Sequence, residues 1–169
     1  FLRVRGPPRS TRSRSSAASD VYKRQAWKDG SDMEAREGML LGSLLAGVAF
    51  SHSDVAAVHC LAEALGALYD APHGACNSIA LPAVMEFSMD ACVDRYARVA
   101  ACLGLSFSTP REGAEKAVEE VKRMAIDLEL PSLSVFGIKE EDFDEIAAKS
   151  EANSSNPDNP KIMKKDDYI

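Results

Sequence analysis

Apolar residues recur every three or four positions along most of the chain from residue 31 onwards, which is the spacing of helices with one buried face. This spacing predicts six helices, at residues 31–50, 51–70, 71–89, 90–104, 109–130 and 139–152. Residues 131–138 and 153–161 are predicted as loops, and residues 163–169 as the start of a further helix. No alternating pattern of useful length indicates strands. The pattern therefore predicts an all-α domain, an orthogonal or irregular helical bundle.

Residues that commonly flank helices support several of these ends. Ser31 and Glu34 have the spacing of a capping box, in which the two side chains accept backbone N–H groups of the first turn. Pro82 is expected to kink the third helix or to mark its last turn, because proline has no backbone N–H to donate. The other predicted N-caps are Ser53 or Asp54, Asp90, and Thr109 with Pro110 after it.

The first 25 residues differ in composition from the rest of the chain. They hold seven of the 20 Lys and Arg residues but one of the 26 Asp and Glu residues. Such a segment fits a transit peptide, a basic arm for nucleic acid, or a sequencing artefact. Residues 7–11 and 15–25 resemble, in that order, the translated flow-cell primer and transposase-type adapter of a sequencing library. We therefore predict that residues 1–25 are a disordered, adapter-derived segment and that the domain spans residues 26–169.

The domain without this segment is strongly acidic. It keeps 13 of the 20 basic residues and 25 of the 26 acidic ones, a formal charge of −12. A surface of this sign repels phosphate backbones, so no nucleic-acid partner is expected. The longest apolar run, residues 39–50, is too short to span a bilayer, so no membrane association is expected either.

The cysteines indicate a reducing compartment. They lie in helical apolar runs without the paired spacing of a zinc knuckle. We expect buried, reduced thiols, as in a cytoplasmic protein. The four residues are Cys60, Cys76, Cys92 and Cys102.

Two histidines bracket the turn between the second and third predicted helices. Residues 59–74 read HCLAEALGALYDAPHG, with His59 in the apolar run and His73 fourteen positions later. A tight turn can bring both imidazoles toward one point, where they would form half of an Fe, Zn, Cu or Ni site. The alternative is a satisfied core histidine and a helix-start residue. Nearby candidates for further ligands are Glu63, His52 and Asp70.

Several stretches resemble the C-terminal domain of the iron-containing (group III) alcohol dehydrogenases. DMEAREGMLLGSLLAGVAFS (32–51) is similar to the helix that leads into the family's site. VHCLAEALGALYDAPHG (58–74) resembles its metal-binding signature, with a histidine, then LG, then PHG at the same spacing. CNSIALPAVMEF (76–87) and NPK (159–161) extend the match to essentially all of residues 26–169. The resemblance implies an irregular multi-helix bundle of the dehydroquinate synthase-like or iron alcohol dehydrogenase C-terminal domain type.

The resemblance also implies a reaction. His59 and His73 would be two of four ligands to a divalent metal, usually Fe(II) and sometimes Zn(II). The metal would act as a Lewis acid on the substrate oxygen while hydride passes between an alcohol or aldehyde and NAD or NADP. The other two ligands, an Asp and a His, and the Rossmann-like cofactor domain would lie upstream. We therefore expect an inactive fragment, truncated at both ends and without cofactor-binding residues, of a homo-oligomeric parent enzyme.

The chain departs from the family pattern at two places. Glu63 stands where many members have a second histidine, and it could serve in a proton relay, add a ligand, or be a solvated glutamate. His52 and Asp54 replace smaller or neutral residues, which affects the shape of the substrate pocket more than metal binding. Phe50 matches a family aromatic that lines the substrate channel, but it could equally be a core residue.

The sequence admits two other functions. A free-standing helical module could bind a partner or a metal ion without catalysis, which would require a native start near residue 26. A zinc-dependent polyol dehydrogenase would have the same histidine spacing, because imidazole binds both iron and zinc. For either dehydrogenase, the expected partner is a small alcohol or aldehyde.

Overall fold

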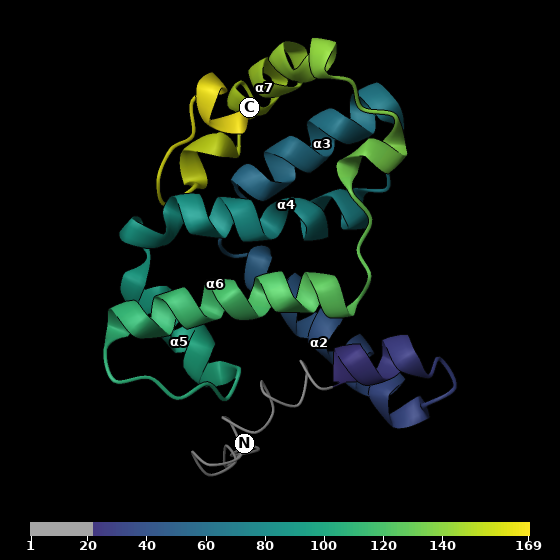
Figure 1. Cartoon of the computed structure of the whole chain (residues 1–169), viewed down its shortest axis with the longest axis vertical. Coiled ribbons are helices and arrows are strands. Elements are labelled where there is room, and N and C mark those ends of the chain that lie inside the picture. Colours follow the sequence, from purple (N-terminus) through teal and green to yellow (C-terminus); the bar gives the residue numbers. More distant parts are fainter. Residues whose placement is uncertain (1–21) are drawn as a thin grey trace, which may run out of the picture. The chain divides into compact units, whose positions relative to one another are not determined.

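The computed structural model describes residues 22–169, so most of the predicted adapter-derived segment lies outside the described residues. Residues 22–169 contain helices and no strands, which confirms the all-α prediction (Figure 1). They divide into two compact units, each described separately below. Unit 1 contains residues 22–48 and 93–117, and unit 2 contains residues 49–92 and 118–169.

Unit 1 is built from helices at both of its segments. Residues 22–28 are helical, so the domain boundary predicted at residue 26 falls inside this segment. The longer elements are α2 (Met33–Phe50, whose last two residues belong to unit 2), α5 (Val93–Cys102) and the part of α6 (Pro110–Asp127) up to Ala117.

The start of α2 differs from the prediction. Asp32 is the cap, because its Oδ1 accepts the backbone N–H of Ala35 at 3.0 Å. Ser31 instead donates its hydroxyl to Asp29, and Glu34 accepts a hydrogen bond from the Tyr22 hydroxyl. The capping box predicted for Ser31 and Glu34 is therefore wrong, since Asp32, one position closer to the helix than Ser31, caps it instead.

The start of α6 matches the prediction. Thr109 caps it through Oγ1, which accepts the backbone N–H of Glu112 at 3.2 Å, and Pro110 is its first residue. One turn later, Gly113 lies against the ring of Phe107, where a Cβ would come within 2.9 Å of the ring carbon Cδ2. Glycine is therefore required for this close approach within unit 1.

The α2 helix exposes most of its large apolar side chains. Its one residue classed as buried is Ala35. Five others lie on a stripe with helical spacing and are more than half exposed: Leu40, Leu41, Leu44, Leu45 and Val48. We call these five residues the α2 apolar stripe. Isolated exposed apolar residues are ordinary, whereas a continuous exposed apolar stripe on one helix is uncommon on a monomeric protein.

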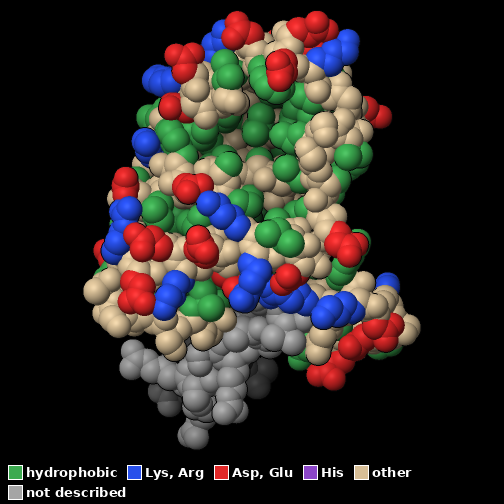
Figure 2. All heavy atoms as spheres, viewed as in Figure 1, with side chains coloured by type: hydrophobic (Ala, Val, Ile, Leu, Met, Phe, Trp, Pro, Cys, Tyr) green, Lys and Arg blue, Asp and Glu red, His purple; other side chains and the backbone are tan. Residues whose placement is uncertain are grey.

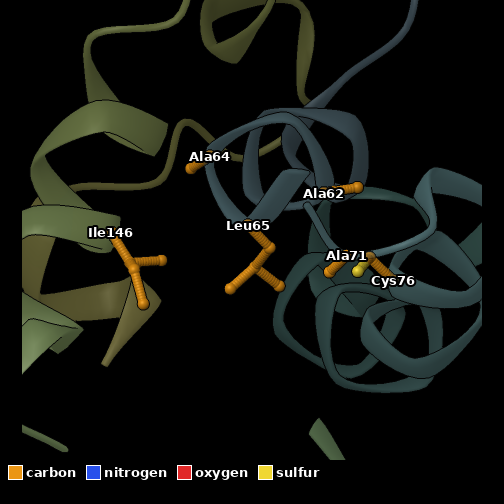
Figure 3. Close-up of a cluster of buried hydrophobic side chains, with 6 residues drawn as sticks. All are labelled: Ala62, Ala64, Leu65, Ala71, Cys76 and Ile146. Atoms are coloured by element: carbon orange, nitrogen blue, oxygen red, sulfur yellow. The ribbon is translucent and has the colours of Figure 1, made fainter. Parts of the chain in front are cut away.

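Unit 2 is centred on α3 (Ala57–Tyr69), which packs against α4 (His73–Ser88) and α7 (Phe143–Glu151) (Figure 1). In the core, the side chain of Leu65 of α3 lies between Ile146 of α7 on one side and, on the other, Ala71 in the turn before α4 and Cys76 of α4 (Figure 3). Apolar side chains also gather on the face of this unit seen in the upper half of Figure 2. The 3₁₀ helices are η1 (Met89–Ala91), η2 (Leu133–Phe136), η3 (Glu140–Asp142), η4 (Asn156–Asp158) and η5 (Lys165–Tyr168).

Two predicted N-caps are wrong, one before α3 in unit 2 and one before α5, which begins directly after the first segment of unit 2. The α3 helix begins three residues after Asp54, at Ala57, and its N-cap Ala56 makes no side-chain bond. Asp54 has a positive φ of 61° and accepts the N–H of Val55, so it ends the preceding turn. Asp90 lies within η1, and α5 starts after it, at Val93. Pro82 lies inside α4, which continues to Ser88.

The cysteines follow the prediction with one exception. All four are free thiols, and Cys60, Cys76 and Cys92 are buried. Cys102 is exposed at the end of α5, because the apolar spacing of a helix does not fix which residues of its last turn are covered. No helix among residues 22–169 is long and apolar enough to cross a membrane.

Candidate metal centre

The two imidazoles predicted to meet do lie close together. His59 is in the first turn of α3, and His73 is the first residue of α4. The turn between them is tight because Asp70 adopts a left-handed conformation (φ 52°) and Pro72 is extended before α4. The ring centroids of His59 and His73 are 5.2 Å apart, and the ring planes are tilted by 54°.

The surroundings of His59 favour its neutral form. Burial lowers the pKa of His59, and the neighbouring His73 lowers it further, while the negative charge of Glu63 acts in the opposite direction. His59 is half-buried and His73 is exposed. The neutral imidazole is the form that binds a metal ion, so His59 is suited to a cation without first losing a proton at neutral pH.

The donor set fits part of a metal site. Two imidazoles at consecutive helix starts suit iron or zinc. Within residues 22–169, no third His, Cys, Asp or Glu side chain joins them in an arrangement that could hold a metal ion. His52 is exposed and bonded to Ser51, and Asp70 is an exposed C-cap. The predicted local candidates therefore do not complete the site.

A pocket of about 350 Å³ opens beside His59. Its walls are largely apolar, and the predicted aromatic Phe50 belongs to them. The size is that of a small-molecule site, in which a few polar groups set the orientation of an otherwise apolar ligand. The pocket is lined by Phe50, Asp54, Val55, Ala56, Val58, His59, Asn77, Ser78 and Leu81.

Asn77 in this wall was not predicted from the sequence. It lies on α4, four residues after His73, and its Oδ1 is buried without a hydrogen-bond partner. The spacing of four residues from a candidate ligand was the available signal, because residues so spaced share a helix face. Asparagine is also common on solvated helix surfaces, so the spacing alone could not distinguish it.

Glu63 lies one turn after His59 on α3 and is exposed. Its Oε2 accepts a hydrogen bond from Asn153 Nδ2 at 2.7 Å. Asn153 is itself held, because its Oδ1 accepts the backbone N–H of Ser155 at 2.9 Å. The carboxylate is thus oriented by a residue from the far end of the chain, although no metal ligation by Glu63 is indicated.

The fold and the histidine pair define a class of protein, a helical domain with two neighbouring imidazoles beside a small apolar pocket. Residues 21–169 match the Fe-containing alcohol dehydrogenase family, C-terminal. The chain belongs to this family, as its histidine signature indicates.

Named relatives agree with this assignment. The chain is 39% identical to the 1,3-propanediol dehydrogenase of Klebsiella pneumoniae over 140 residues, which is 79% of this chain and 36% of that protein. It is 33% identical to the NAD-dependent methanol dehydrogenase of Bacillus methanolicus over 144 residues, which is 83% of this chain and 38% of that protein. A crystal structure of 1,3-propanediol oxidoreductase matches with a TM-score of 0.85 and 32% identity, over 96% of this chain and 44% of that one. The chain thus spans less than half the length of these relatives.

Proposed function

We propose that the chain supplies part of the metal site and of the substrate pocket of an NAD(P)-dependent alcohol dehydrogenase. The proposal rests chiefly on the 5.2 Å approach of the His59 and His73 rings within a domain of the iron-containing family. The relatives named above are dehydrogenases of small alcohols and diols. The substrate is accordingly a small alcohol or aldehyde, and NAD or NADP would be held mainly by residues outside this chain.

His59 and His73 would hold a divalent iron through one nitrogen of each ring. When bound, such an ion supplies Lewis-acid chemistry, which favours the alkoxide form of an alcohol. The histidine donors do not separate iron from zinc, so both are candidates. We expect no catalysis from this chain alone. Within its described residues, His59 and His73 come together without a third possible ligand, and two ligands are too few for a stable metal site.

Phe50, Val58 and Leu81 would contact the carbon chain of the substrate and exclude water from the reacting carbon. All three line the pocket that His59 also borders. Water exclusion matters because a dry pocket strengthens the electrostatic interactions that act on the reacting groups. A branched or longer substrate would meet Phe50 at the end of α2.

Glu63 would accept the proton that the alcohol loses. Its carboxylate is exposed and lies on the same face of α3 as His59, one turn away. The bond from Asn153 leaves the second carboxylate oxygen free of that contact and restricts the side chain to one orientation. Glutamate is a common general base in such positions when a proton can pass directly or through one water molecule.

Zinc titration of the metal-free chain tests the metal proposal. Zinc is a suitable probe because it is stable in air and binds imidazole. We expect His59→Ala and His73→Ala each to weaken zinc binding at least tenfold in isothermal titration calorimetry. His52→Ala is the matched control, since this exposed third histidine is bonded to Ser51 and does not border the pocket. If all three variants bind zinc as tightly as the wild type does, the proposed metal role of His59 and His73 is refuted.

A further inference from the structure

Asn77 has an unusual hydrogen-bond state. Its Oδ1 is the buried side-chain oxygen or nitrogen that lacks a hydrogen-bond partner within residues 22–169. A buried acceptor without a donor destabilises the folded chain, because it has lost its bonds to water and gained none. Such a group in a native protein calls for an explanation, and a role in binding is a common one.

The position of Asn77 relates it to the histidine pair. It follows His73 by four residues on α4, so the two side chains are neighbours on one helix face, with Cβ atoms about 5–6 Å apart. Side chains on a helix incline toward its N-terminus, so the carboxamide of Asn77 leans over the turn that carries His73. Asn77 also shares the wall of the 350 Å³ pocket with His59.

The missing donor is better supplied by a histidine ring than by a ligand in the pocket. The unpaired Oδ1 is buried, so its donor is best supplied by a side chain that already lies beside it. The imidazole of His73 starts from the adjacent turn of the same helix, at the spacing at which helix side chains interact. A metal-binding histidine usually donates its second ring N–H to an oxygen of this kind.

We propose that Asn77 is a positioning residue for the metal site, whose Oδ1 accepts the ring N–H of His73 when the other ring nitrogen of His73 binds the metal ion. This inference rests on the proposed function. The bond fixes which nitrogen of His73 carries the proton and directs the other nitrogen toward the metal. The unpaired oxygen would then gain its donor when the metal ion binds.

Two measurements distinguish a positioning role of Asn77 from a purely structural one: the zinc affinity of the chain, and its thermal unfolding midpoint without zinc. Asn77→Leu removes the acceptor at similar volume, and Asn77→Asp keeps an acceptor. We expect Asn77→Leu to weaken zinc binding at least tenfold while the thermal unfolding midpoint of the metal-free chain stays equal or rises. Asn77→Asp is expected to retain most of the zinc affinity. Long-range ¹H–¹⁵N spectra of the zinc complexes should show a single tautomer of His73 in the wild type and in Asn77→Asp.

Ser78→Ala is the matched control. Ser78 lies next in sequence and in the same pocket wall, but its hydroxyl is already donated to the carbonyl of Gly74 at 2.8 Å. This variant is expected to bind zinc as the wild type does.

Three results would overturn the inference. Wild-type zinc affinity in Asn77→Leu would show that the acceptor is not used, and if His73→Ala still loses zinc, the proposed function survives. A lower unfolding midpoint together with weaker binding in Asn77→Leu would assign Asn77 a structural role. Equally weak binding in Asn77→Asp would show that an acceptor at this position does not orient His73.

Discussion

Asn153 donates its side-chain N–H to the carboxylate of Glu63, joining two residues ninety positions apart. It is the first of three asparagines at intervals of three, followed by Asn156 and Asn159. Asn156 donates to the Met163 carbonyl at 2.8 Å, and Asn159 donates to Ser88 Oγ at the end of α4 at 3.0 Å. The bonds of Asn153 and Asn159 attach the C-terminal segment to α3 and α4, which carry the histidine pair, and the bond of Asn156 joins two parts of that segment.

Among the three asparagines, Asn156 should contribute most to the stability of the C-terminal segment. It is 3% exposed, and besides its bond to Met163 it accepts the hydroxyl of Tyr168 at 2.8 Å. Asn156→Ala would leave the buried Met163 carbonyl without this donor and remove one partner of the Tyr168 hydroxyl, so we expect the free energy of unfolding to fall by about 2–3 kcal/mol. Urea denaturation measures this. Asn153→Ala, at a more exposed position, should cost less than half as much, and equal losses would contradict the argument.

Among the apolar residues of unit 2, truncation of Leu65 should lower the free energy of unfolding most. It is 1% exposed and lies between α7 and the start of α4 (Figure 3). Leu65→Ala removes buried methyl groups and leaves a cavity, which we expect to cost about 2–5 kcal/mol of unfolding free energy. Leu44→Ala on the α2 apolar stripe, where the side chain is 64% exposed, should change it by less than about 0.5 kcal/mol. Chemical denaturation of both variants checks the contrast.

Tyr168 should make the fold sensitive to alkaline pH. Burial raises the pKa of Tyr168 above its usual value, and the nearby Cys60 thiol adds to the effect. A raised folded-state pKa gives a contribution to stability that is complete below the unfolded-state value of about 10 and is lost as pH rises above it. Wild type should therefore lose more stability than Tyr168→Phe between pH 7 and about pH 10.5. Unfolding midpoints at both pH values test this, and parallel losses in the two proteins would rule out the Tyr168 contribution.

The helices and the histidine pair were predictable from the sequence because their causes are local. Apolar spacing located each helix, and the short segment from His59 to His73 restricted how far apart the rings could lie. Their role as metal ligands stays a prediction. Helix ends were less predictable, since Asp32 and Ser31 are both good caps and small differences in backbone geometry decided between them.

The partners of polar side chains could not be predicted from local sequence. The bond between Asn153 and Glu63 depends on how α7 and the residues after it pack on α3. The unpaired oxygen of Asn77 depends on burial by residues that are distant in sequence. Both residues have ordinary polar surroundings in the sequence, so their significance becomes visible once the helices are in place.

The α2 apolar stripe should cause the isolated chain to self-associate. Leu40, Leu41, Leu44, Leu45 and Val48 are between 54% and 74% exposed on one helix, a continuous apolar surface of the kind that other proteins cover. We expect oligomers or aggregates whose size grows with concentration in sedimentation velocity, and a shift toward monomer in the double variant Leu41→Glu/Leu44→Glu. Ile126→Glu is the control, because Ile126 is 76% exposed but stands on α6, away from the stripe in sequence. A wild-type chain that sediments as a monomer at all concentrations and melts sharply would contradict this prediction.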